Sequence, residues 1–330
     1  MNTIRIGLLG TGHLGKIHLK LLKQIPEFEL VGFFDLNAET REKVSEEFEV
    51  PAFDDLDELI SQVDAMDIVT PTTTHFELAS KVMQAGKHVF VEKPLTQEME
   101  EAEGLLKLAE EFPQLVTQVG HVERFNPAFL SINDIELNPM FIEGHRLALY
   151  NPRGTDVSVV LDLMIHDIDV VLSLVKSPVA NVSASGVAVV SKTPDIANAR
   201  IEFENGAVAN LTASRMSVKN MRRLRMFQPA TYLAVDFLEK KTEIFRLADM
   251  DEEVNSPMKF EINTGEETKY LVYELPEVKE VNAIKMELEE FNASIRENKS
   301  VRVPFKAGYE SLKVAHQIID SIRILSEKVL

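Results

Sequence analysis

The chain of 330 residues contains no cysteine. This absence excludes disulfide bonds, thiolate catalysis and zinc or iron–sulfur sites built on cysteine. The sequence also has no uninterrupted apolar stretch close to the ~18 residues of a membrane span, and its first residues lack the pattern of a signal peptide. We therefore expect a cytoplasmic protein that does not insert into a membrane.

Positive charge is scarce, because 35 Lys and Arg residues face 53 Asp and Glu residues, which gives a formal net charge of −18. A nucleic-acid-binding surface needs clustered basic residues, so we expect no nucleic-acid partner. A negatively charged small substrate is still compatible, because one pocket can be basic on an acidic protein. The length suggests roughly two domains of ~150 residues.

The first third of the sequence alternates short apolar runs with amphipathic helical patterns, which is typical of a parallel sheet covered by helices. We expect strands at residues 4–9, 30–35, 65–70, 88–91 and 115–119. We expect helices at residues 14–24, 38–48, 56–61, 75–85 and 98–111. This order predicts an α/β fold that begins with a doubly wound Rossmann domain over residues 1–122.

After residue 122 the pattern changes to one helix at 159–175 and then several strand-like runs, with Asn205-Gly206 as a strong hairpin signal. The acidic stretch 249–269 is poorly periodic and predicts a loop or insertion. Residues 123–330 are expected to form an α+β domain on an open, mostly antiparallel sheet, whose last helix could also pack on the first domain. The further elements expected are strands at 199–203, 207–213, 223–227 and 231–237 and helices at 281–296 and 309–328.

The segment from Gly10 to Gly15, Gly-Thr-Gly-His-Leu-Gly, matches the dinucleotide-binding pattern G-x-G-x-x-G. It follows the first expected strand and opens a helix, which is the context that the pattern requires. The first glycine allows a tight turn, the second lets the backbone approach a pyrophosphate, and the third lets the helix pack on the strand. The cofactor contacts expected here are Gly10, Thr11, Gly12, His13, Leu14 and Gly15.

Asp35 ends the second expected strand, 20 residues beyond Gly15. An acid at this place accepts hydrogen bonds from the ribose hydroxyls of the adenosine. Its negative charge repels a 2′-phosphate, so the sequence favours NAD over NADP. The alternative is a glycine-rich turn without a ligand, which the agreement of strand, helix and acid disfavours.

Glu92-Lys93-Pro94 directly follows the expected strand 88–91. Lys93 is thereby placed at the carboxyl edge of the parallel sheet, where open α/β folds bind ligands. Pro94 stiffens the turn, which favours a fixed position for the lysine. A lysine at a strand end is more often a solvated surface charge, and this alternative stays open.

Asp162 and His166 lie four residues apart in the expected helix 159–175, so they share one helix face. Such a pair could bind a sugar diol and move a proton, because the pKa of histidine lies near neutrality. The alternative is an ion cluster on the helix surface. A metal site from His166, Asp167, Asp169 and His121 is disfavoured, because these close helical spacings do not converge like zinc ligands, and we expect no metal.

Taken in this order, Gly10–Gly15, Asp35, Glu92-Lys93-Pro94 and Asp162-x-x-x-His166 resemble the motifs of the Gfo/Idh/MocA family of NAD(P)-dependent oxidoreductases. The resemblance covers essentially the whole chain. It implies a Rossmann domain followed by a domain with an open sheet, whose free face commonly forms dimers or tetramers.

The same resemblance implies roles for individual residues. Lys93 would lie between the nicotinamide and the reacting carbon, His166 would be the acid–base residue, and Asp162 would hold a substrate hydroxyl. Further cofactor contacts are implied for Thr70, Pro71, His75, Glu92, Lys93, Gln118 and His121.

A narrower likeness, to UDP-N-acetylglucosamine 3-dehydrogenases, is carried by residues 120–128 and 152–157. Those enzymes oxidise the sugar 3-hydroxyl, and an aminotransferase then installs an amine for a modified lipid A. The likeness implies substrate contacts by Arg124, Asn126 and Arg153, together with Lys93, Asp162 and His166. Arginine suits a diphosphate through bidentate hydrogen bonds, although an ion pair elsewhere is an equal alternative for each arginine.

These residues predict oxidation of a secondary ring hydroxyl to a ketone, with hydride transfer to NAD. Either His166 or Lys93 could take the hydroxyl proton, because the positive charge of the oxidised nicotinamide disfavours the ammonium form of Lys93. A dehydrogenase of inositol or a free sugar uses the same residues, and so does an NAD-dependent glycosidase of the same superfamily. A non-catalytic sensor is disfavoured, because Lys93 and His166 are both present.

Overall fold

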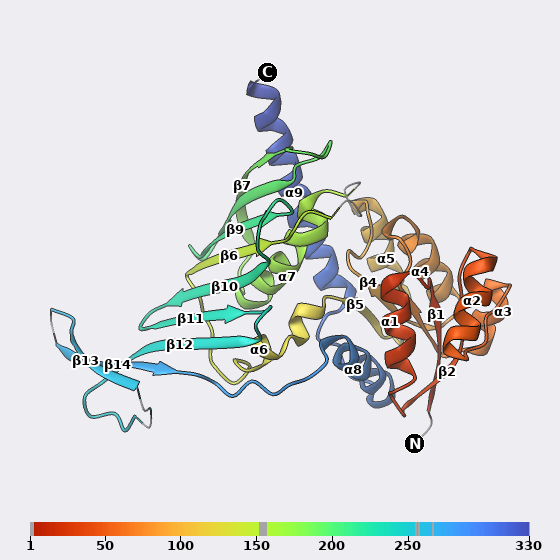
Figure 1. Ribbon diagram of the computed structural model, residues 1–330, viewed down its shortest axis with the longest axis horizontal. Helices are drawn as coiled ribbons and strands as arrows, with labels where there is room; N and C mark the ends of the chain where they lie inside the picture. The colour runs from red at the N-terminus through yellow and green to blue at the C-terminus, as the bar shows by residue number, and fades with distance from the viewer. Residues whose placement is uncertain (1–2, 152–156, 255, 257, 266, 330) are drawn as a thin grey trace. The chain divides into compact units, whose positions relative to one another are not determined.

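The computed structural model describes residues 3–151, 157–254, 256, 258–265 and 267–329 (Figure 1). The chain divides into two compact units. The first unit comprises Met1–Phe125 and Asn282–Lys313, and the second comprises Asn126–Val281 and Val314–Leu330. The helix expected at 281–296 therefore belongs to the first unit, and the last helix contributes to both.

The first unit is built on a five-stranded parallel sheet in the order β2-β1-β3-β4-β5. Its strands are β1 (Ile4–Leu9), β2 (Phe28–Phe34), β3 (Ala65–Ile68), β4 (His88–Glu92) and β5 (Thr117–Gly120). Its principal helices are α1 (His13–Leu22), α2 (Ala38–Phe48), α3 (Leu56–Gln62), α4 (His75–Gln84), α5 (Met99–Glu111) and α8 (Ala283–Glu297). The expected Rossmann-type α/β fold is thus confirmed.

The sheet has one further parallel contact, at a single residue. Ala52 forms an isolated parallel bridge to Phe33 on β2. When this bridge is counted as the third strand in chain order, the spatial order becomes 3-2-1-4-5-6, which is that of the Rossmann fold. The switch point of such a sheet lies between β1 and β3, and ligands bind beside the carboxyl ends of the strands there.

Helix α8 packs into the apolar core of the first unit although it is distant in sequence. Leu288 and Phe291 are fully buried, and the Phe291 ring meets Phe90 of β4 edge-on at a centroid distance of 5.9 Å. Burying each such side chain stabilises the unit by about 1.5–3 kcal/mol. Helix α8 is therefore an integral layer of the cofactor domain, which places its side chains close to β4 and β5.

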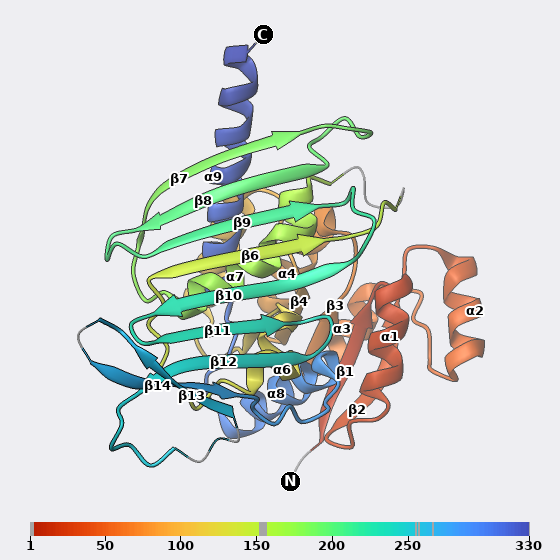
Figure 2. The same ribbon diagram turned by 60° about the vertical axis from the view of Figure 1, so that its left-hand side comes forward.

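The second unit is built on a nine-stranded sheet in the order β13-β14-β12-β11-β10-β6-β9-β8-β7 (Figure 2). Its strands are β6 (Phe141–Leu147), β7 (Val179–Val187), β8 (Ile196–Phe203), β9 (Val208–Ser214), β10 (Met221–Gln228), β11 (Thr231–Asp236), β12 (Lys241–Ala248), β13 (Met258–Asn263) and β14 (Thr268–Glu274). Among these described strands only β6 and β9 pair in parallel, so the expected mostly antiparallel sheet is confirmed.

Helices cover one face of this sheet. The core contains alternate residues of the strands, α7 (Ile165–Leu174) and residues 314–322 of α9 (Phe305–Val329). Short helices η2 (Val122–Phe125) and α6 (Pro127–Leu130) join the units in sequence. In the part of the chain that is described, no helix is both long and apolar enough to cross a membrane.

The structure corrects two details of the sequence interpretation. The acidic stretch 249–269 is not simply a loop, because it contains β13 and the start of β14, which form a hairpin at the sheet edge. Polar and apolar residues alternate irregularly there because β13 is mostly exposed on both faces. The helix expected at 159–175 begins with a π-helical turn, η3 (Val160–Met164), before α7.

Candidate active site

The glycine-rich loop joins β1 to α1 and has the space that a dinucleotide needs. A Cβ atom on Gly15 would lie 2.0 Å from the Gly10 carbonyl oxygen, so only glycine allows this close packing of helix and strand. Gly10 has a φ of +86°, which other residues rarely adopt. A Cβ on Gly12 would meet nothing within 4 Å, so the space beside this backbone is open to a ligand.

Asp35 is fixed beside this loop. Its Oδ2 accepts hydrogen bonds from the Thr11 backbone N–H at 2.8 Å and from the Thr11 hydroxyl at 2.9 Å, and its Oδ1 accepts from the Asn37 N–H at 3.0 Å. A carboxylate oxygen can accept more than one bond, so ribose hydroxyls can still be bound. His13 and Leu14 form the first turn of α1, where N–H groups remain for a phosphate. The residues therefore fit NAD.

The Lys93 turn follows β4 directly and is held by contacts on both sides. The Lys93 backbone N–H donates to Glu92 Oε2 at 3.1 Å. His75 lies between two backbone carbonyl oxygens, with Nδ1 at 2.9 Å from Pro94 O and Nε2 at 2.9 Å from Thr70 O. Burial lowers the pKa of His75, against the opposing effect of these carbonyl groups, and the ring lies between the two loops that carry Thr70 and Pro94.

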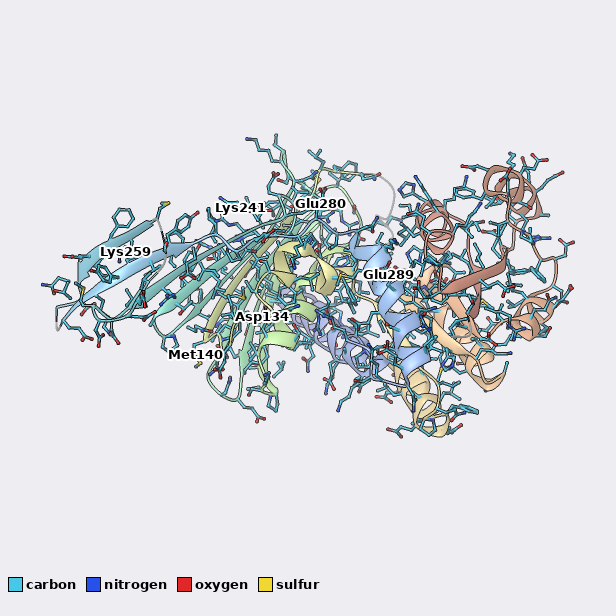
Figure 3. All side chains as sticks on the ribbon, turned by 90° about the horizontal axis from the view of Figure 1, so that it is seen from below. Asp134, Met140, Lys241, Lys259, Glu280 and Glu289 are labelled. Carbon is cyan, nitrogen blue, oxygen red and sulfur yellow. The ribbon has the colours of Figure 1, made fainter. Side chains whose placement is uncertain are left out.

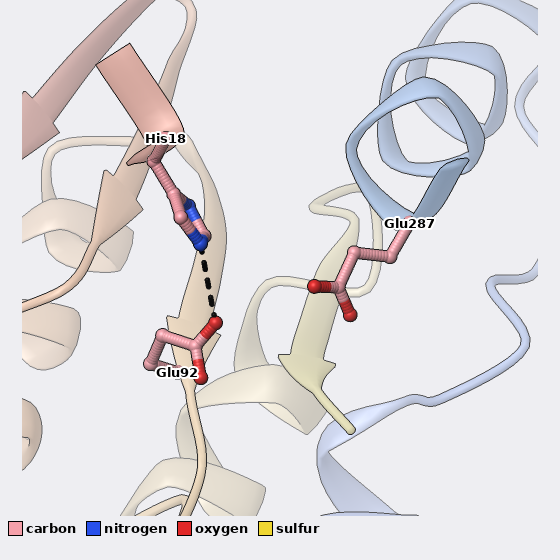
Figure 4. Close-up of side chains that lie close together, drawn as sticks. All are labelled: His18, Glu92 and Glu287. Atoms are coloured by element: carbon pink, nitrogen blue, oxygen red, sulfur yellow. Dashed lines mark ion pairs between the residues drawn. The ribbon is translucent and has the colours of Figure 1, made fainter. Parts of the chain in front are cut away.

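Behind this turn lies a cluster of ionisable side chains, which we call the buried cluster: His18, Asp67, Glu92 and Glu287. Figure 4 shows His18, Glu92 and Glu287. His18 Nδ1 is 2.8 Å from Asp67 Oδ2, and His18 Nε2 is 3.4 Å from Glu92 Oε1. Burial disfavours the imidazolium, but Asp67 and Glu92 together raise the pKa of His18 well above its usual value. Burial raises the pKa of Asp67, although His18 opposes this effect. Burial also raises the pKa of Glu287, to well above its usual value.

Four other residues are expected to contact the cofactor: Thr70 and Pro71 follow β3, Gln118 lies in β5 and His121 directly follows β5. The Thr74 hydroxyl donates to the Thr70 hydroxyl oxygen at 2.8 Å, which closes the turn that contains Pro71. Gln118 is fully buried, and its amide Nε2–H donates to the Glu287 carbonyl oxygen at 3.0 Å. His121 is buried directly after β5. The contacts of all four residues with the cofactor stay predictions.

In the second unit, Asp162 and His166 occupy successive turns, Asp162 in η3 and His166 in α7, and both are partly exposed. π-Helical turns occur often at functional sites. Asp167 is buried and forms an ion pair with Arg146, whose Nη2 lies 2.7 Å from Asp167 Oδ1. This contact gives Asp167 a structural partner within the second unit.

The residues expected to bind substrate through the narrower likeness have different surroundings. Asn126 is buried, where its Oδ1 accepts from the Ala128 N–H at 3.1 Å and its Nδ2 donates to Phe237 O at 3.0 Å. Its side chain thus caps α6 and ties it to the segment after β11. Arg124 lies in η2 and is partly exposed. Arg153 lies outside the described residues.

Sequence reasoning missed three members of the buried cluster, namely His18, Asp67 and Glu287. A signal was present in two of them. His18 lies on the apolar face of α1 beside Leu14 and Leu22, and Glu287 lies in the apolar stripe of α8. An ionisable residue in such a stripe must find a partner or lose its charge when the helix packs.

Comparison with known proteins identifies the family. Residues 4–121 match the oxidoreductase family with an NAD-binding Rossmann fold, and residues 144–228 match the GFO/IDH/MocA C-terminal domain. The UDP-N-acetylglucosamine 3-dehydrogenase of Acidithiobacillus ferrooxidans is 42% identical over 243 residues, which cover 73% of this chain and 77% of that protein. The scyllo-inositol 2-dehydrogenase (NAD(+)) of Bacillus subtilis is 31% identical, covering 65% of this chain and 68% of that protein.

A solved structure extends this similarity to the whole chain. The structure of UDP-N-acetylglucosamine 3-dehydrogenase GnnA from A. ferrooxidans covers 98% of this chain and 99% of its own, with a TM-score of 0.88 and 36% sequence identity. The glycine loop, the fixed Asp35 and the Lys93 turn agree with the family match. The chain therefore belongs to the Gfo/Idh/MocA family, and it is an NAD-dependent dehydrogenase that acts on CH–OH groups.

Proposed function

We propose that the protein oxidises a secondary ring hydroxyl of a nucleotide sugar, namely the 3-hydroxyl of a UDP-N-acetylhexosamine. The observation that carries the proposal is the similarity to UDP-N-acetylglucosamine 3-dehydrogenase, at 36% identity over 98% of this chain. Compared by sequence, the scyllo-inositol 2-dehydrogenase is 31% identical over 65% of the chain, against 42% over 73% for the UDP-N-acetylglucosamine 3-dehydrogenase. A nucleotide sugar is therefore a better candidate substrate than a cyclitol.

The first unit supplies cofactor binding and one polar group for the reaction. The glycine loop would hold the pyrophosphate and Asp35 the adenosine ribose, and bound NAD supplies a hydride acceptor. Lys93 stands on a turn fixed by Glu92 and His75, so its Nζ can be presented in one place. There it donates a hydrogen bond to the substrate oxygen as negative charge develops on it.

The second unit supplies the proton acceptor. His166 takes the proton of the substrate hydroxyl on a ring nitrogen, and Asp162, one turn earlier, holds a neighbouring hydroxyl through its carboxylate. Neutral histidine suits this step at physiological pH. The product is a ketone, which is the class of substrate that an aminotransferase converts to an amine. An aminotransferase is therefore the pathway partner that we expect.

The substrate is tested by NADH formation with NAD and UDP-N-acetylglucosamine, measured by absorbance in the presence of a carbonyl trap. NADH should appear with the UDP-sugar and not with free N-acetylglucosamine or scyllo-inositol. Turnover on a free sugar or cyclitol alone would contradict the nucleotide-sugar assignment and leave the dehydrogenase class intact. Net hydrolysis of a glycoside without net NADH would instead show an NAD-dependent glycosidase.

We further propose that a second copy of the chain covers the face of the nine-stranded sheet that lies opposite its helices. One row of residues crosses six strands on this face, paired in register, and we call it the aromatic row: Phe141, Phe227, Tyr232, Phe245, Tyr273 and Met258. Neighbouring rings in the row lie 4.7 to 5.8 Å apart between centroids.

The charged residues beside the aromatic row are paired with one another, so this face does not repel a second copy of the acidic chain. Glu143 pairs with Arg225, and Glu243 pairs with Arg223 and Lys241. This face is therefore locally balanced on a chain of net charge −18, so two copies can approach there without strong repulsion. A two-fold interface that buries one apolar patch on both subunits is the commonest arrangement.

Sedimentation velocity tests this proposal. The wild-type protein should sediment as a dimer or tetramer, and Phe245→Asp should shift it towards the monomer, because a buried carboxylate would face the partner. Val218→Asp is the matched control, since Val218 is 91% exposed in the same unit outside the aromatic row. A monomeric wild-type protein would contradict the proposal.

A further inference from the structure

The buried cluster of His18, Asp67, Glu92 and Glu287 takes no direct part in the proposed reaction. It brings together three carboxyl groups and one imidazole from α1, β3, β4 and α8, all within the first unit. Ionisable groups are rarely buried without a function, because their desolvation costs free energy. The cluster also lies directly behind the Lys93 turn, because Glu92 is the residue before Lys93.

We propose that His18 and Glu287 are positioning residues, which hold the Glu92 carboxylate in one place and thereby fix the turn that presents Lys93. The inference rests on the proposed role of Lys93 in hydroxyl oxidation. The two oxygens of the Glu92 carboxylate link the buried cluster to the backbone of Lys93. Glu92 Oε1 lies 3.4 Å from His18 Nε2, and Glu92 Oε2 accepts the Lys93 N–H at 3.1 Å.

The surroundings leave the Glu92 carboxylate little freedom. On one side, a Cβ atom on Gly120 would lie 2.7 Å from Glu92 Oε1, so the carboxylate is in close contact with the backbone of β5. On another side, Asp67 Oδ2 lies 2.8 Å from His18 Nδ1 and orients the ring so that Nε2 faces Glu92. Carboxylates beside both nitrogens favour the imidazolium form of His18, which is hydrogen-bonded to Asp67 through Nδ1 and forms an ion pair with Glu92 through Nε2.

Glu287 closes the cluster from α8. Both of its carboxyl oxygens are buried, and neither has a hydrogen-bond partner among the residues that the structure describes. One ligand-type atom from each of His18, Glu92 and Glu287 lies within 4.8 Å of the others (Figure 4). The side chain is therefore aimed at the other two rather than at solvent.

Electrostatics then determine the form in which Glu287 is held. With every carboxyl group ionised and His18 protonated, the interior would carry an excess of two negative charges. Leaving a proton on Glu287 removes one of these charges, and burial followed by the charge of Glu92 raises the pKa of Glu287 well above its usual value. The ionisable groups that face Glu287 are His18 from α1, Asp67 from β3, Glu92 from β4 and Glu290 from α8 itself.

A protonated Glu287 is neutral and can turn its polar O–H towards Glu92, although the two carboxyl groups are not hydrogen-bonded, whereas an ionised Glu287 repels Glu92. Deprotonation would move the Glu92 carboxylate and loosen the Lys93 turn without touching the glycine loop. The expected signature is therefore a fall in kcat with unchanged affinity for NAD. If the cluster had a purely structural role, its disruption would lower the stability of the protein, kcat and the affinity for NAD together.

Two substitutions of Glu287 separate these roles. Glu287→Leu fills the same space but has no polar group to turn towards Glu92, and it should lower kcat by at least about tenfold, while the Kd for NAD and the KM for substrate change by less than about twofold. Glu287→Gln keeps a neutral polar group and should restore most of kcat. Glu289→Gln is the matched control on α8, since the exposed Glu289 pairs only with Lys285 among the interactions described (Figure 3).

A measurement independent of activity follows the melting temperature between pH 6 and 9. A carboxyl group whose pKa is raised by folding contributes its stabilisation at low pH and loses it as the pH rises through the folded-state pKa. The wild-type melting temperature should therefore decline more steeply with rising pH than that of Glu287→Gln. Glu289→Gln should follow the wild type.

Several outcomes would overturn the inference. If Glu287→Leu keeps full kcat, Glu287 does not position the Lys93 turn. If Glu287→Gln is less stable at every pH and a chelator lowers the wild-type melting temperature, the cluster holds a cation in place of a proton. Failure of the proposed function is distinguished from both, because it appears as full activity of Lys93→Met while the melting curves still report on Glu287.

Discussion

In the first unit, the candidate site consists of strand ends and backbone atoms, whereas the site residues that we propose in the second unit are side chains on a helix. The space around Gly12 and Gly15, the bond from Thr11 to Asp35 and the turn after β4 all follow from the path of the main chain. Asp162 and His166 owe their placement to one π-helical turn and the helix after it.

This difference between the units separates cofactor binding, which many proteins share, from substrate recognition, which is specific to one protein. Backbone N–H groups at a helix start bind any pyrophosphate, so the first unit identifies a cofactor class without identifying a substrate. We expect substrate choice to depend on side chains of the second unit, such as Asp162 and His166. The cofactor is therefore established more firmly than the sugar, and variants of the two units should fail in different ways.

Lys93→Met gives the largest expected effect and tests whether the first unit takes part in chemistry as well as in binding. Removing the positioned ammonium should lower kcat by about 10³-fold, since a positioned acid–base or electrostatic group contributes about 10²–10⁴-fold. The Kd for NAD should stay within about twofold, because the glycine loop is unchanged. Steady-state kinetics and NAD titration measure the two quantities, with the exposed Lys107→Met as control.

Equal losses of kcat and of NAD affinity in Lys93→Met would contradict this assignment. They would show that Lys93 is part of the cofactor cradle only. Full activity would show that the lysine is a solvated surface charge, which is the ordinary alternative at a strand end.

His166→Ala tests the other side of the comparison and should have a smaller effect, about 10²-fold in kcat. If His166 is the base, the variant should also lose the acidic limb of the pH dependence of kcat, which reports protonation of the base. NAD binding should not change, because His166 belongs to the second unit. A pH profile that keeps its acidic limb would move the role of base to Lys93.

The sequence was sufficient for the elements that carry a strong local signal. The alternation of strands and helices predicted the parallel sheet, and Asn205-Gly206 predicted the hairpin between β8 and β9. The outermost pairing of this sheet was not predictable, because it is reduced to the single bridge from Phe33 to Ala52. The contribution of α8 to the first unit depends on packing between segments that are distant in sequence.

The candidate site shows the same limit. Gly10–Gly15, Asp35 and Lys93 were found because each stands at a fixed offset from a strand. Glu287 was not found, because its partners come from three other elements, and no spacing in the sequence links them. Likewise, only the structure shows that Asn126 caps α6 and bonds to Phe237 O. A motif identifies a residue type, and packing determines which partners it meets.

Gly12→Ala and Gly15→Ala sharpen the comparison within the first unit. A Cβ at residue 12 meets nothing within 4 Å, so the melting temperature should be unchanged, but the methyl group would hold a phosphate away from the loop. The Kd for NAD should rise about 10- to 100-fold, as for lost hydrogen bonds to a charged group.

At residue 15 the Cβ would lie 2.0 Å from Gly10 O, so Gly15→Ala should lower the melting temperature as well as the affinity. Differential scanning fluorimetry and NAD titration separate the two effects. A destabilised Gly12→Ala with normal NAD affinity would mean that the loop is a structural turn and not a phosphate cradle.

Asp35→Ser should have the smallest effect, and it tests the side chain that lies nearest to the loop. Losing one charged acceptor for the ribose should raise the Kd for NAD by about tenfold, because a hydrogen bond to a charged group is worth about 1.5–3 kcal/mol. The Kd for NADP should fall at the same time, because the repulsion of the 2′-phosphate disappears. Thr11→Val is the control, since it removes only the hydroxyl bond to Asp35 and keeps the charge. It should therefore leave the ratio of NAD to NADP affinity unchanged. A ratio that moves equally in both variants would show that Asp35 acts by holding Thr11, and that cofactor choice is made by another residue.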